Sequence, residues 1–362
     1  MANVAEETIS WLQTEQLHAA EEWSYLLPTG FSWWADRHLQ TIEIVGEETG
    51  PSGETGYLVC VRTELLRDMD LTDIALERVN AWPMRCAALC GPVYDVPARR
   101  LDLWSLVRVT DDNGAWIRYL LGAAAVTQLA EARLIAPVLA EAVSAKSATS
   151  DHPESGPRTV PDQMIYAAAT FVSSGDEPSA WKSAEFAEAA GTKMTGGAAV
   201  DESGLTVDFP FGTDVSECRL VSDQPHPLYG NGLLVLQRFP IAVASETDGI
   251  RMALSLNGAD LTRQVNGYGL GSYVYADGAL HFTGFVPNGM YRPGLLANLY
   301  ASCGARAQMM AARFTEGSWD ADAFSLDAAV LARRAERQRA EAAPAVERPL
   351  RGCPMMRARA PE

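Results

Sequence analysis

The stretch YLVCVRT, residues 57–63, and the following segment DLTDIALERVNAW, residues 70–82, carry the order of elements that decides the fold. The first run is apolar and rich in β-branched residues, which predicts a strand. The second has apolar residues at helical spacing, begins at a capping residue, Asp70 or Thr72, and stops before Pro83. The sequence therefore predicts a strand followed directly by a helix.

The same order recurs in the second half of the chain. GLLVLQRFPIAV, residues 232–243, again reads as a strand and precedes a helical segment. When one half is laid on the other, Arg62 falls on Arg238 and Asn80 falls on Asn257. A repeat that takes up half of the chain is not a solenoid, whose units run about 20 to 50 residues. We expect an α+β fold of two similar tandem domains, each an antiparallel sheet packed with helices, related by a pseudo-two-fold axis.

The expected organisation has four parts. Residues 1–145 and 178–324 form the two domains, the polar, Pro-rich residues 146–177 form a linker, and residues 325–362 form a charged helix and a disordered Arg-rich tail. The expected helices are residues 4–26, 70–82, 116–144, 181–190, 245–261 and 293–314. The expected strands are residues 31–34, 40–45, 57–63, 101–109, 204–211, 217–222, 232–243, 271–277 and 280–287, the last two joined by the turn signal ADGA.

The charge limits the partners. The 362 residues carry a net charge of −17, which argues against nucleic acid and anionic membranes, because both require a clustered positive field. The chain begins without a basic segment followed by an apolar one, and its apolar runs are short of the roughly 20 residues of a membrane span. We expect a cytoplasmic protein whose partner is another protein.

The cysteines and histidines predict neither a metal site nor a cofactor. The six cysteines are scattered, as expected of buried thiols in a reducing compartment, and only Cys86 and Cys90 are close in sequence. The five histidines supply no matching set of ligands, and neither the nucleophile motif G-x-S-x-G nor a phosphate-binding loop is present. These absences favour a protein without catalytic activity.

The order of the quoted segments resembles a known fold. Helix, three strands, helix, two strands and helix occur twice, over about residues 5–145 and 178–314. This order is similar to class I type III secretion chaperones and to YbjN-like domains. The resemblance implies an acidic, dimer-like protein that holds an unfolded segment of a partner and hydrolyses nothing. The carrying segments are QTIEIV, YLVCVRT, LTDIALERVNAW, LDLWSLVRV and WIRYLLGAAAVTQLAEARL in the first half, and ECRLVS, LLVLQRFP, GIRMALSLNGA, GSYVYAD, LHFTGFVP and LLANLYASCGARAQMMAARF in the second.

Four residues are candidate contacts with such a partner. Trp33 and Trp34 would face opposite sides of a strand, so one of them is expected to be partly exposed as an anchor, with core packing as the alternative. Arg62 and Arg238 share a place in the two halves, either to hold a carboxylate or to protect a strand edge.

Two loops offer further candidates. In FVPNGMYRPGLLANLY, residues 285–300, the turn and helix start explain Asn288-Gly289 and Pro293 but not Tyr291 and Arg292, which could contact a partner. In DQPHPLYGNG, residues 223–232, a ligand site is possible at Asp223, His226 and Tyr229, although a surface hairpin loop is the simpler interpretation.

The main hypothesis is thus a chaperone-like or adaptor protein that binds a partner segment, either in the groove between the domains or along a sheet edge. One alternative is a small-ligand sensor or enzyme that uses the loop around His226 and the corner at Tyr291 and Arg292. Another is a structural assembly subunit joined through its charged ends. The chain is expected to act as a monomeric pseudo-dimer or as a homodimer.

Overall fold

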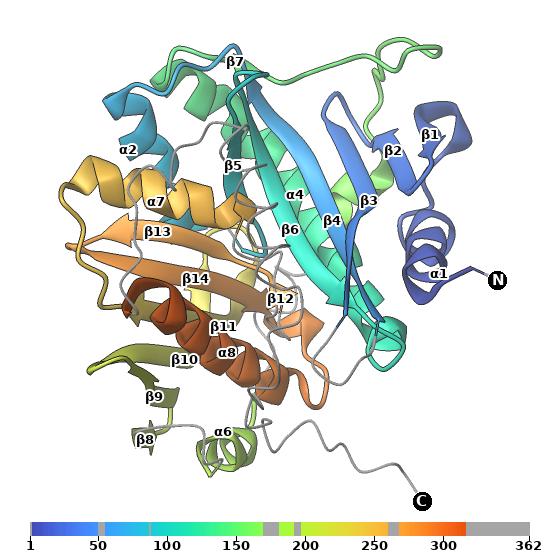
Figure 1. Ribbon diagram of the computed structural model, residues 1–362. Coiled ribbons are helices and arrows are strands. Elements are labelled where there is room, and N and C mark those ends of the chain that lie inside the picture. The colour runs from blue at the N-terminus through green and yellow to red at the C-terminus, as the bar shows by residue number, and fades with distance from the viewer. Residues whose placement is uncertain are drawn as a thin grey trace, which may run out of the picture.

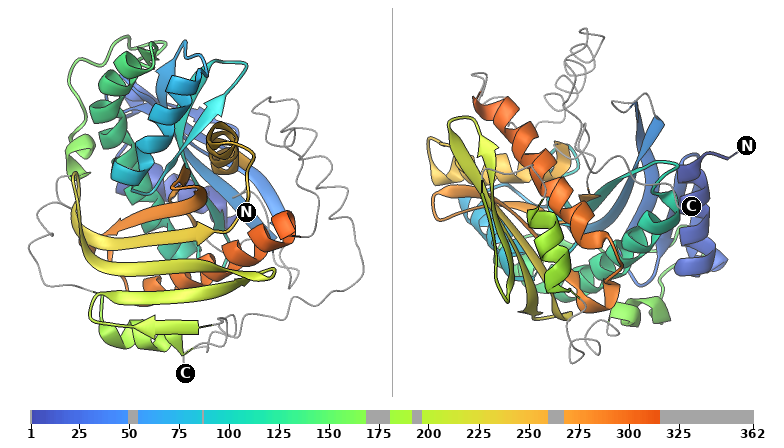
Figure 2. Two further views of the ribbon diagram at one scale, coloured as in Figure 1. Left: turned by 90° about the vertical axis from the view of Figure 1, so that its left-hand side faces the viewer. Right: turned by 90° about the horizontal axis from the view of Figure 1, so that it is seen from below.

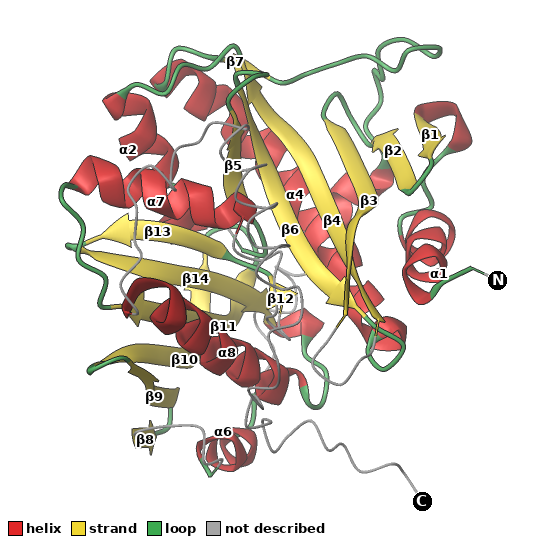
Figure 3. Cartoon of the chain, in the orientation of Figure 1, coloured by secondary structure: helices red, strands yellow, loops and turns green. Residues whose placement is uncertain are grey.

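The chain forms two antiparallel sheets with helices packed on them, so the α+β prediction is confirmed (Figures 1 and 3). The computed structural model describes residues 2–49, 55–86, 88–168, 181–191, 197–259 and 268–315. The predicted tail helix at residues 325–343 lies outside the described residues.

The first half begins with a short helix and ends with a long one. Helix α4, which starts at the last residue of the DDNG turn, crosses one face of the sheet (Figure 1). The elements of the first half are α1 (Val4–Trp11), the π-helical turn η1 (Leu12–Gln16), the turn η2 (Glu21–Trp23), β1 (Ser24–Leu27), β2 (Gly30–Trp34), β3 (Leu39–Thr49), β4 (Thr55–Arg67), α2 (Asp73–Ala81), α3 (Pro83–Cys86), β5 (Gly91–Asp95), β6 (Arg100–Val109) and α4 (Gly114–Ala142).

The second half repeats this order. Helix α8 lies on one face of the second sheet, as α4 does on the first (Figure 2). After β7 (Lys146–Ser147) and the turn η3 (Gln163–Ala168), its elements are α6 (Ser183–Ala190), β8 (Gly197–Val200), β9 (Gly204–Phe211), β10 (Asp214–His226), β11 (Gly230–Phe239), α7 (Glu246–Ala259), β12 (Tyr268–Gly269), β13 (Ser272–Ala276), β14 (Ala279–Pro287), the turn η6 (Asn288–Met290) and α8 (Leu295–Thr315).

Strand order shows that the two sheets are equivalent. The first runs β1-β2-β3-β4-β6-β5, and the second runs β8-β9-β10-β11-β14-β13. The register agrees as well, because Ile42 pairs with Val61 in the first sheet as Cys218 pairs with Gln237 in the second, one residue before Arg62 and Arg238. The sequence alignment that matches Arg62 with Arg238 therefore also matches the strands around them.

Several predicted element boundaries are wrong. The first helix was expected to continue to residue 26, but it ends after η1, and His18 has a φ of 46°. Strand β1 occupies the end of that segment, because residues 24–27 pair with β2. Strand β5 was also missed, since Gly91-Pro92 is a typical turn signal in sequence. Proline is tolerated at a sheet edge, where no ladder hydrogen bond is required of it.

The segment expected to be a linker with little to bury is packed over its described part. β7 pairs with the end of β4, and Ile165 is buried against the first half. Arg158 donates to the carbonyl oxygen of Trp34 over 2.6 Å and to Asp162 over 2.8 Å. We call residues 148–162 the strap, because they run across the end of β2.

The two halves meet through equivalent elements. Helix α2 packs on α7, and β5 of the first half contacts α7 and β13 of the second. The side chain of Asn80 exchanges two hydrogen bonds with the backbone of Tyr275, over 2.7 and 2.8 Å. Gly91 permits the close approach of the halves, since a Cβ there would lie 2.7 Å from the Asn257 side-chain oxygen.

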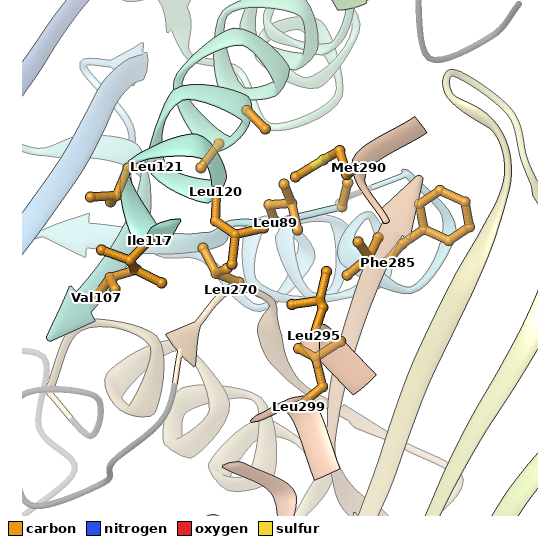
Figure 4. Packing of buried hydrophobic residues seen from close by; sticks show 14 of the residues in the cluster. Leu89, Val107, Ile117, Leu120, Leu121, Leu270, Phe285, Met290, Leu295 and Leu299 are labelled. Atoms are coloured by element: carbon orange, nitrogen blue, oxygen red, sulfur yellow. The ribbon is translucent and has the colours of Figure 1, made fainter. Parts of the chain in front are cut away.

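The hydrophobic cores are continuous between the halves. Figure 4 shows Ile117 and Leu120 of α4 beside Leu270, with Phe285 and Leu299 of the second half in the same cluster. Strand β12 also extends the first sheet by pairing with β6 beyond the end of β5. The predicted groove between the halves is therefore filled by side chains at this junction.

Candidate functional site

Neither predicted tryptophan anchor is exposed. Trp33 is fully buried in the core and donates its ring N–H to Gln40 over 3.0 Å. Trp34, which faces the other side of β2, is only 3% exposed because the strap covers it. Its ring N–H donates to Ser150 over 2.9 Å, and its ring meets that of His152 edge-on. The expectation of a partly exposed tryptophan is thus wrong, and the core-packing alternative holds for both residues.

The two paired arginines are equivalent in position but not in surroundings. Arg62 is half-buried, and its Nε lies in a buried position without a hydrogen-bond partner. Glu43, Glu64 and Asp102 carry charges on the same face of the first sheet. Arg238 is exposed, and together with burial it lowers the pKa of the neighbouring His281. The structure therefore does not make these arginines a matched pair of sites.

The two predicted loops come together. Asn288, at the corner before α8, donates to Asp223 over 3.0 Å and accepts the ring N–H of Trp181 over 2.8 Å. Tyr291 packs edge-on against Trp181 and donates to Glu185 over 3.0 Å. The corner thereby anchors the segment that leads into α6, which gives Tyr291 a structural role that a turn alone did not require.

Arg292 and Asp223 stay at the surface of this junction. The guanidinium of Arg292 is exposed and donates to the carbonyl oxygen of Tyr291 over 2.7 Å. Asp223 is exposed, has a φ of 55°, and accepts from Asn288. Neither contact forms an acid–base pair.

His226 and Tyr229 face the junction between the halves instead. His226 Nδ1 accepts the backbone N–H of Leu228 over 3.1 Å, and its ring stacks on that of Tyr229 at 4.8 Å. The buried Tyr229 hydroxyl donates to the Glu131 carboxylate of α4 over 3.1 Å. The structure therefore pairs His226 and Asp223 with different groups, and a His–Asp dyad does not form here.

Glu131 is a functional candidate that sequence reasoning missed. It is fully buried and accepts hydrogen bonds from the Ala88 N–H, the Cys90 thiol and Tyr229. Burial raises the pKa of Glu131 to about 7. The three hydrogen bonds lower this pKa, but burial has the larger effect. Glu131 gives no local sequence signal, because its hydrogen-bond partners come from two distant segments.

The free edge of the first sheet is the second feature that was missed. Strand β1 pairs with β2 on one side, and no other described strand pairs with its opposite side. Leu26 is 74% exposed, the highest value for a large hydrophobic side chain on any described strand, and Tyr25 is 41% exposed. Tyr25 rests on Trp34, with 5.9 Å between the ring centroids.

A hollow adjoins the start of this edge. It has a volume of about 480 Å³ and lies between the turn η2 and the strap, close to the exposed Val160. The exposed carboxylates of Glu21 and Glu22 lie in η2, the turn before β1. We call β1 with this hollow the β1 edge; the hollow is lined by Glu22, Trp23, Arg158, Thr159, Val160, Pro161, Asp162 and Gln163.

A second hollow, of about 730 Å³, lies where α1 meets the start of α4. Arg118 on its wall covers the ring of Trp11 at 4.2 Å. Within the described ranges, no three His, Cys, Asp or Glu side chains are grouped to bind a metal. Only α4, among the described helices, is long and apolar enough to cross a membrane, and 72% of its apolar window is buried, as in the core helix of a soluble protein.

No family model, curated protein or solved structure matches this chain. The fold and the sites above therefore rest on the chain's own residues.

Proposed function

We propose that the protein is a non-enzymatic, cytoplasmic chaperone or adaptor that holds an extended segment of a partner polypeptide at the β1 edge. The observation that carries this proposal is an unpaired outer strand with two exposed hydrophobic side chains, Tyr25 and Leu26. A sheet edge offers N–H and C=O groups to an added strand, while side chains in adjoining pockets provide selectivity. The resemblance to secretion chaperones and YbjN-like domains agrees with this activity.

The filled junction between the halves favours an edge over a groove. Residues of both halves share the same apolar clusters there, and Asn80 bonds directly across the junction. Over the described residues, this packing supports addition of the partner segment to a sheet edge as the binding mode that we propose. The junction takes the place of a dimer interface, which supports a single chain as the binding unit.

The backbone of Leu26 points to the open side of the sheet. Leu27 and Gly30 pair across the two-residue turn between β1 and β2. Antiparallel pairs alternate between hydrogen-bonded and non-hydrogen-bonded positions, and the pair that flanks a two-residue turn is hydrogen-bonded. Tyr25 therefore bonds inward to β2, while Leu26 presents both its N–H and its side chain to an incoming segment.

The surroundings favour a segment that carries basic residues. Five acids and no Lys or Arg occur in residues 1–30. Of these acids, Glu21 and Glu22 are exposed beside the edge. An apolar residue next to a Lys or Arg would place the first against Leu26 and the second near these carboxylates.

The corresponding edge of the second sheet supplies a matched control. Just after β8, the backbone N–H of Asp201 donates to the carbonyl oxygen of Gly204 across the turn. By the same alternation, the backbone groups of Ala199 point inward to β9, and those of Ala198 point outward. All four residues of β8 are exposed. Proline is tolerated at outward positions of an edge strand, because the N–H it removes is not part of the ladder.

The test compares Leu26→Pro, Leu26→Ala and Ala198→Pro. Tagged full-length protein is expressed in its native host, and co-purifying polypeptides are quantified by mass spectrometry. We expect a stoichiometric partner with the wild type, recovery reduced at least tenfold by Leu26→Pro, a smaller loss for Leu26→Ala, and no change for Ala198→Pro. Circular dichroism and thermal melting establish that the three variants are folded.

Equal recovery with folded Leu26→Pro would rule out the β1 edge. Absence of any stoichiometric partner would contradict polypeptide binding itself and would favour the alternative function, a small-ligand sensor. The structure gives that second function no specific support at Asp223, His226 and Tyr229, because each of these side chains already has a structural contact.

A further inference from the structure

Two thiols meet in the core of the second half. Cys218 lies in β10 and Cys303 in α8, and they are 0% and 1% exposed. Gln237, which pairs with Cys218 across the ladder, donates its side-chain amide to the Cys303 carbonyl oxygen over 2.9 Å, and each thiol affects the pKa of the other. A strand and a helix that are far apart in sequence thus place two cysteines side by side.

A buried cation accompanies the two thiols. Arg306 follows Cys303 by one turn of α8 and is only 2% exposed. Its Nη1 lies 3.9 Å from Cys303 Sγ and 3.3 Å from the side-chain oxygen of Gln237. Its guanidinium carbon lies 3.5 Å from the centroid of the Phe282 ring. A guanidinium this close to a thiol favours the thiolate form.

The equivalent residues of the first half show which side chains are sufficient for folding at the positions of Cys303 and Arg306. Because α4 takes the place of α8 in the aligned halves, Ala125 corresponds to Cys303 and Gln128 to Arg306. In both halves a glutamine of the sheet donates to the corresponding helix carbonyl over 2.9 Å: Gln40 to Ala125, and Gln237 to Cys303. The helix carbonyl thus accepts a glutamine amide in both halves, but the glutamine comes from β3 in the first half and from β11, the counterpart of β4, in the second.

The groups that differ are the charged and reactive ones. Gln128, in place of the arginine, donates to Val61 and Ser105 over 3.0 and 2.8 Å. Ile42 takes the place of Cys218, since it pairs with Val61 as Cys218 pairs with Gln237. A neutral amide and two apolar side chains thus suffice for the fold, so the cation and the two thiols are additions particular to the second half.

The two thiols have different proton affinities. The hydrogen bond with Cys218 and the charge of Arg306 lower the pKa of Cys303, against the opposing effect of burial. Burial raises the pKa of Cys218 well above its usual range. Tyr273, whose phenol also lies near Arg306, has a pKa raised to about 12 by burial and stays neutral. Cys303 is therefore the nucleophile of the pair, and Cys218 is a neutral thiol beside it.

We propose that Cys303 and Cys218 form a peroxide-sensitive dithiol that closes to a disulfide between α8 and β10. The Cys303 thiolate attacks a hydroperoxide oxygen, the O–O bond breaks, and Cys303 becomes a sulfenic acid as the other oxygen leaves and takes up a proton. The Cys218 thiol then attacks the sulfenic sulfur, which forms the S–S bond and releases water. The two thiols lose two electrons, and the hydroperoxide gains them.

Burial controls access to this site. Because both sulfur atoms are covered, the hydroperoxide reaches Cys303 only when α8 separates locally from the sheet. The disulfide then ties α8 to β10 and stabilises the second half against further opening. This inference does not depend on the proposed partner binding, since the β1 edge belongs to the first sheet.

The experiment treats native full-length protein with hydrogen peroxide, blocks the remaining thiols by alkylation, and maps each cysteine by mass spectrometry. We expect a Cys218–Cys303 disulfide, with Cys60 and Cys90 still reduced, because burial raises the pKa of both of these thiols. In Cys218→Ser, Cys303 is expected to stop at the sulfenic acid and to react with dimedone.

Arg306→Gln tests the role of the guanidinium. The oxidation of Cys303 is expected to slow at least tenfold, while Arg292→Gln, an exposed arginine of the same half, leaves the rate unchanged. If Arg306→Gln does not fold, the dimedone result for Cys218→Ser decides whether Cys303 is the residue that reacts with peroxide. The proposal is overturned if Cys303 oxidises no faster than Cys60 and Cys90, if Cys218→Ser yields no dimedone adduct on Cys303, or if folded Arg306→Gln reacts at the wild-type rate.

Discussion

The carboxyl group of Glu131 stands where the two halves meet. Its three hydrogen-bond donors come from α4's own half, at Ala88 and Cys90, and from the second half, at Tyr229. Because burial raises its pKa to about 7, this side chain changes charge within the physiological range. It therefore links the stability of the junction to pH.

The sign of this effect follows from the two pKa values. The unfolded value is near 4.5 and the folded value near 7, so the folded protein binds the extra proton between them. The contribution of Glu131 to stability is greatest below pH 4.5, falls as the pH rises to about 7, and is then constant. A difference of this size corresponds to roughly 3 kcal/mol in the free energy of unfolding.

Glu131→Gln should remove that dependence, because an amide does not ionise. In urea unfolding, we expect the wild type to lose roughly 2.5 kcal/mol relative to Glu131→Gln between pH 5 and pH 8. Glu141→Gln, an exposed position on the same helix, should retain the wild-type profile. Parallel profiles for the wild type and Glu131→Gln would show that Glu131 is not the titrating group.

At the scale of elements, two asparagines protect the outer edge of β13. Asn257 of α7 bonds both backbone groups of Tyr273, and Asn80 of α2 bonds both backbone groups of Tyr275. Asn80 and Asn257 are aligned with each other when the two halves are superposed in sequence, yet both bind the same edge, that of β13. One of the caps is thereby a contact within the second half, and the other joins the halves.

Asn80→Ala should leave the Tyr275 N–H and C=O without partners at a buried position. We expect the free energy of unfolding to fall by roughly 2–6 kcal/mol, since each of the two unsatisfied buried groups costs about 1–3 kcal/mol. Chemical denaturation gives this value, and Asn298→Ala serves as the control, because Asn298 is exposed and its side chain donates to the nearby Gly294 carbonyl oxygen. A loss below about 0.5 kcal/mol would mean that water replaces the side chain without cost.

Elements with strong local signals were predictable from the sequence. Thr72 caps α2 by accepting the N–H of Ala75 over 3.2 Å, and the ADGA turn has positive φ at Asp277 and Gly278, 50° and 73°. Strand β1 was missed because its residues continue a helical composition, and only pairing with β2 makes them a strand. Local propensity is a weak prior that long-range pairing overrides.

At the scale of the whole molecule, the two halves share their interior. Two large apolar clusters each contain side chains from both sheets: Val59 and Leu205 in one, Leu65 and Phe239 in the other. Strand β12 of the second half also completes the first sheet. Neither half has a closed core of its own, which makes the pair a single folding unit.

The full chain should therefore unfold in one transition. Circular dichroism and tryptophan fluorescence are expected to give the same midpoint in denaturant, because neither half survives loss of the other. A fragment of residues 1–168 should lack a cooperative transition, since it exposes the apolar face of α4 that the second half covers. Two separated transitions, or a fragment that folds cooperatively, would contradict a shared core.

The sequence alone determined the order of most of the elements and their repetition, because hydrophobic spacing, caps and turn residues act over a few neighbouring positions. Only the tertiary structure decided which surfaces are available. The strap buries Trp34 through a residue 116 positions away, and Asn80 reaches Tyr275 across 195 positions. The pairing of Cys218 with Cys303 and the exposure of Leu26 likewise depend on contacts between distant segments. Such contacts follow from packing of the complete chain, and no local pattern of residues records them.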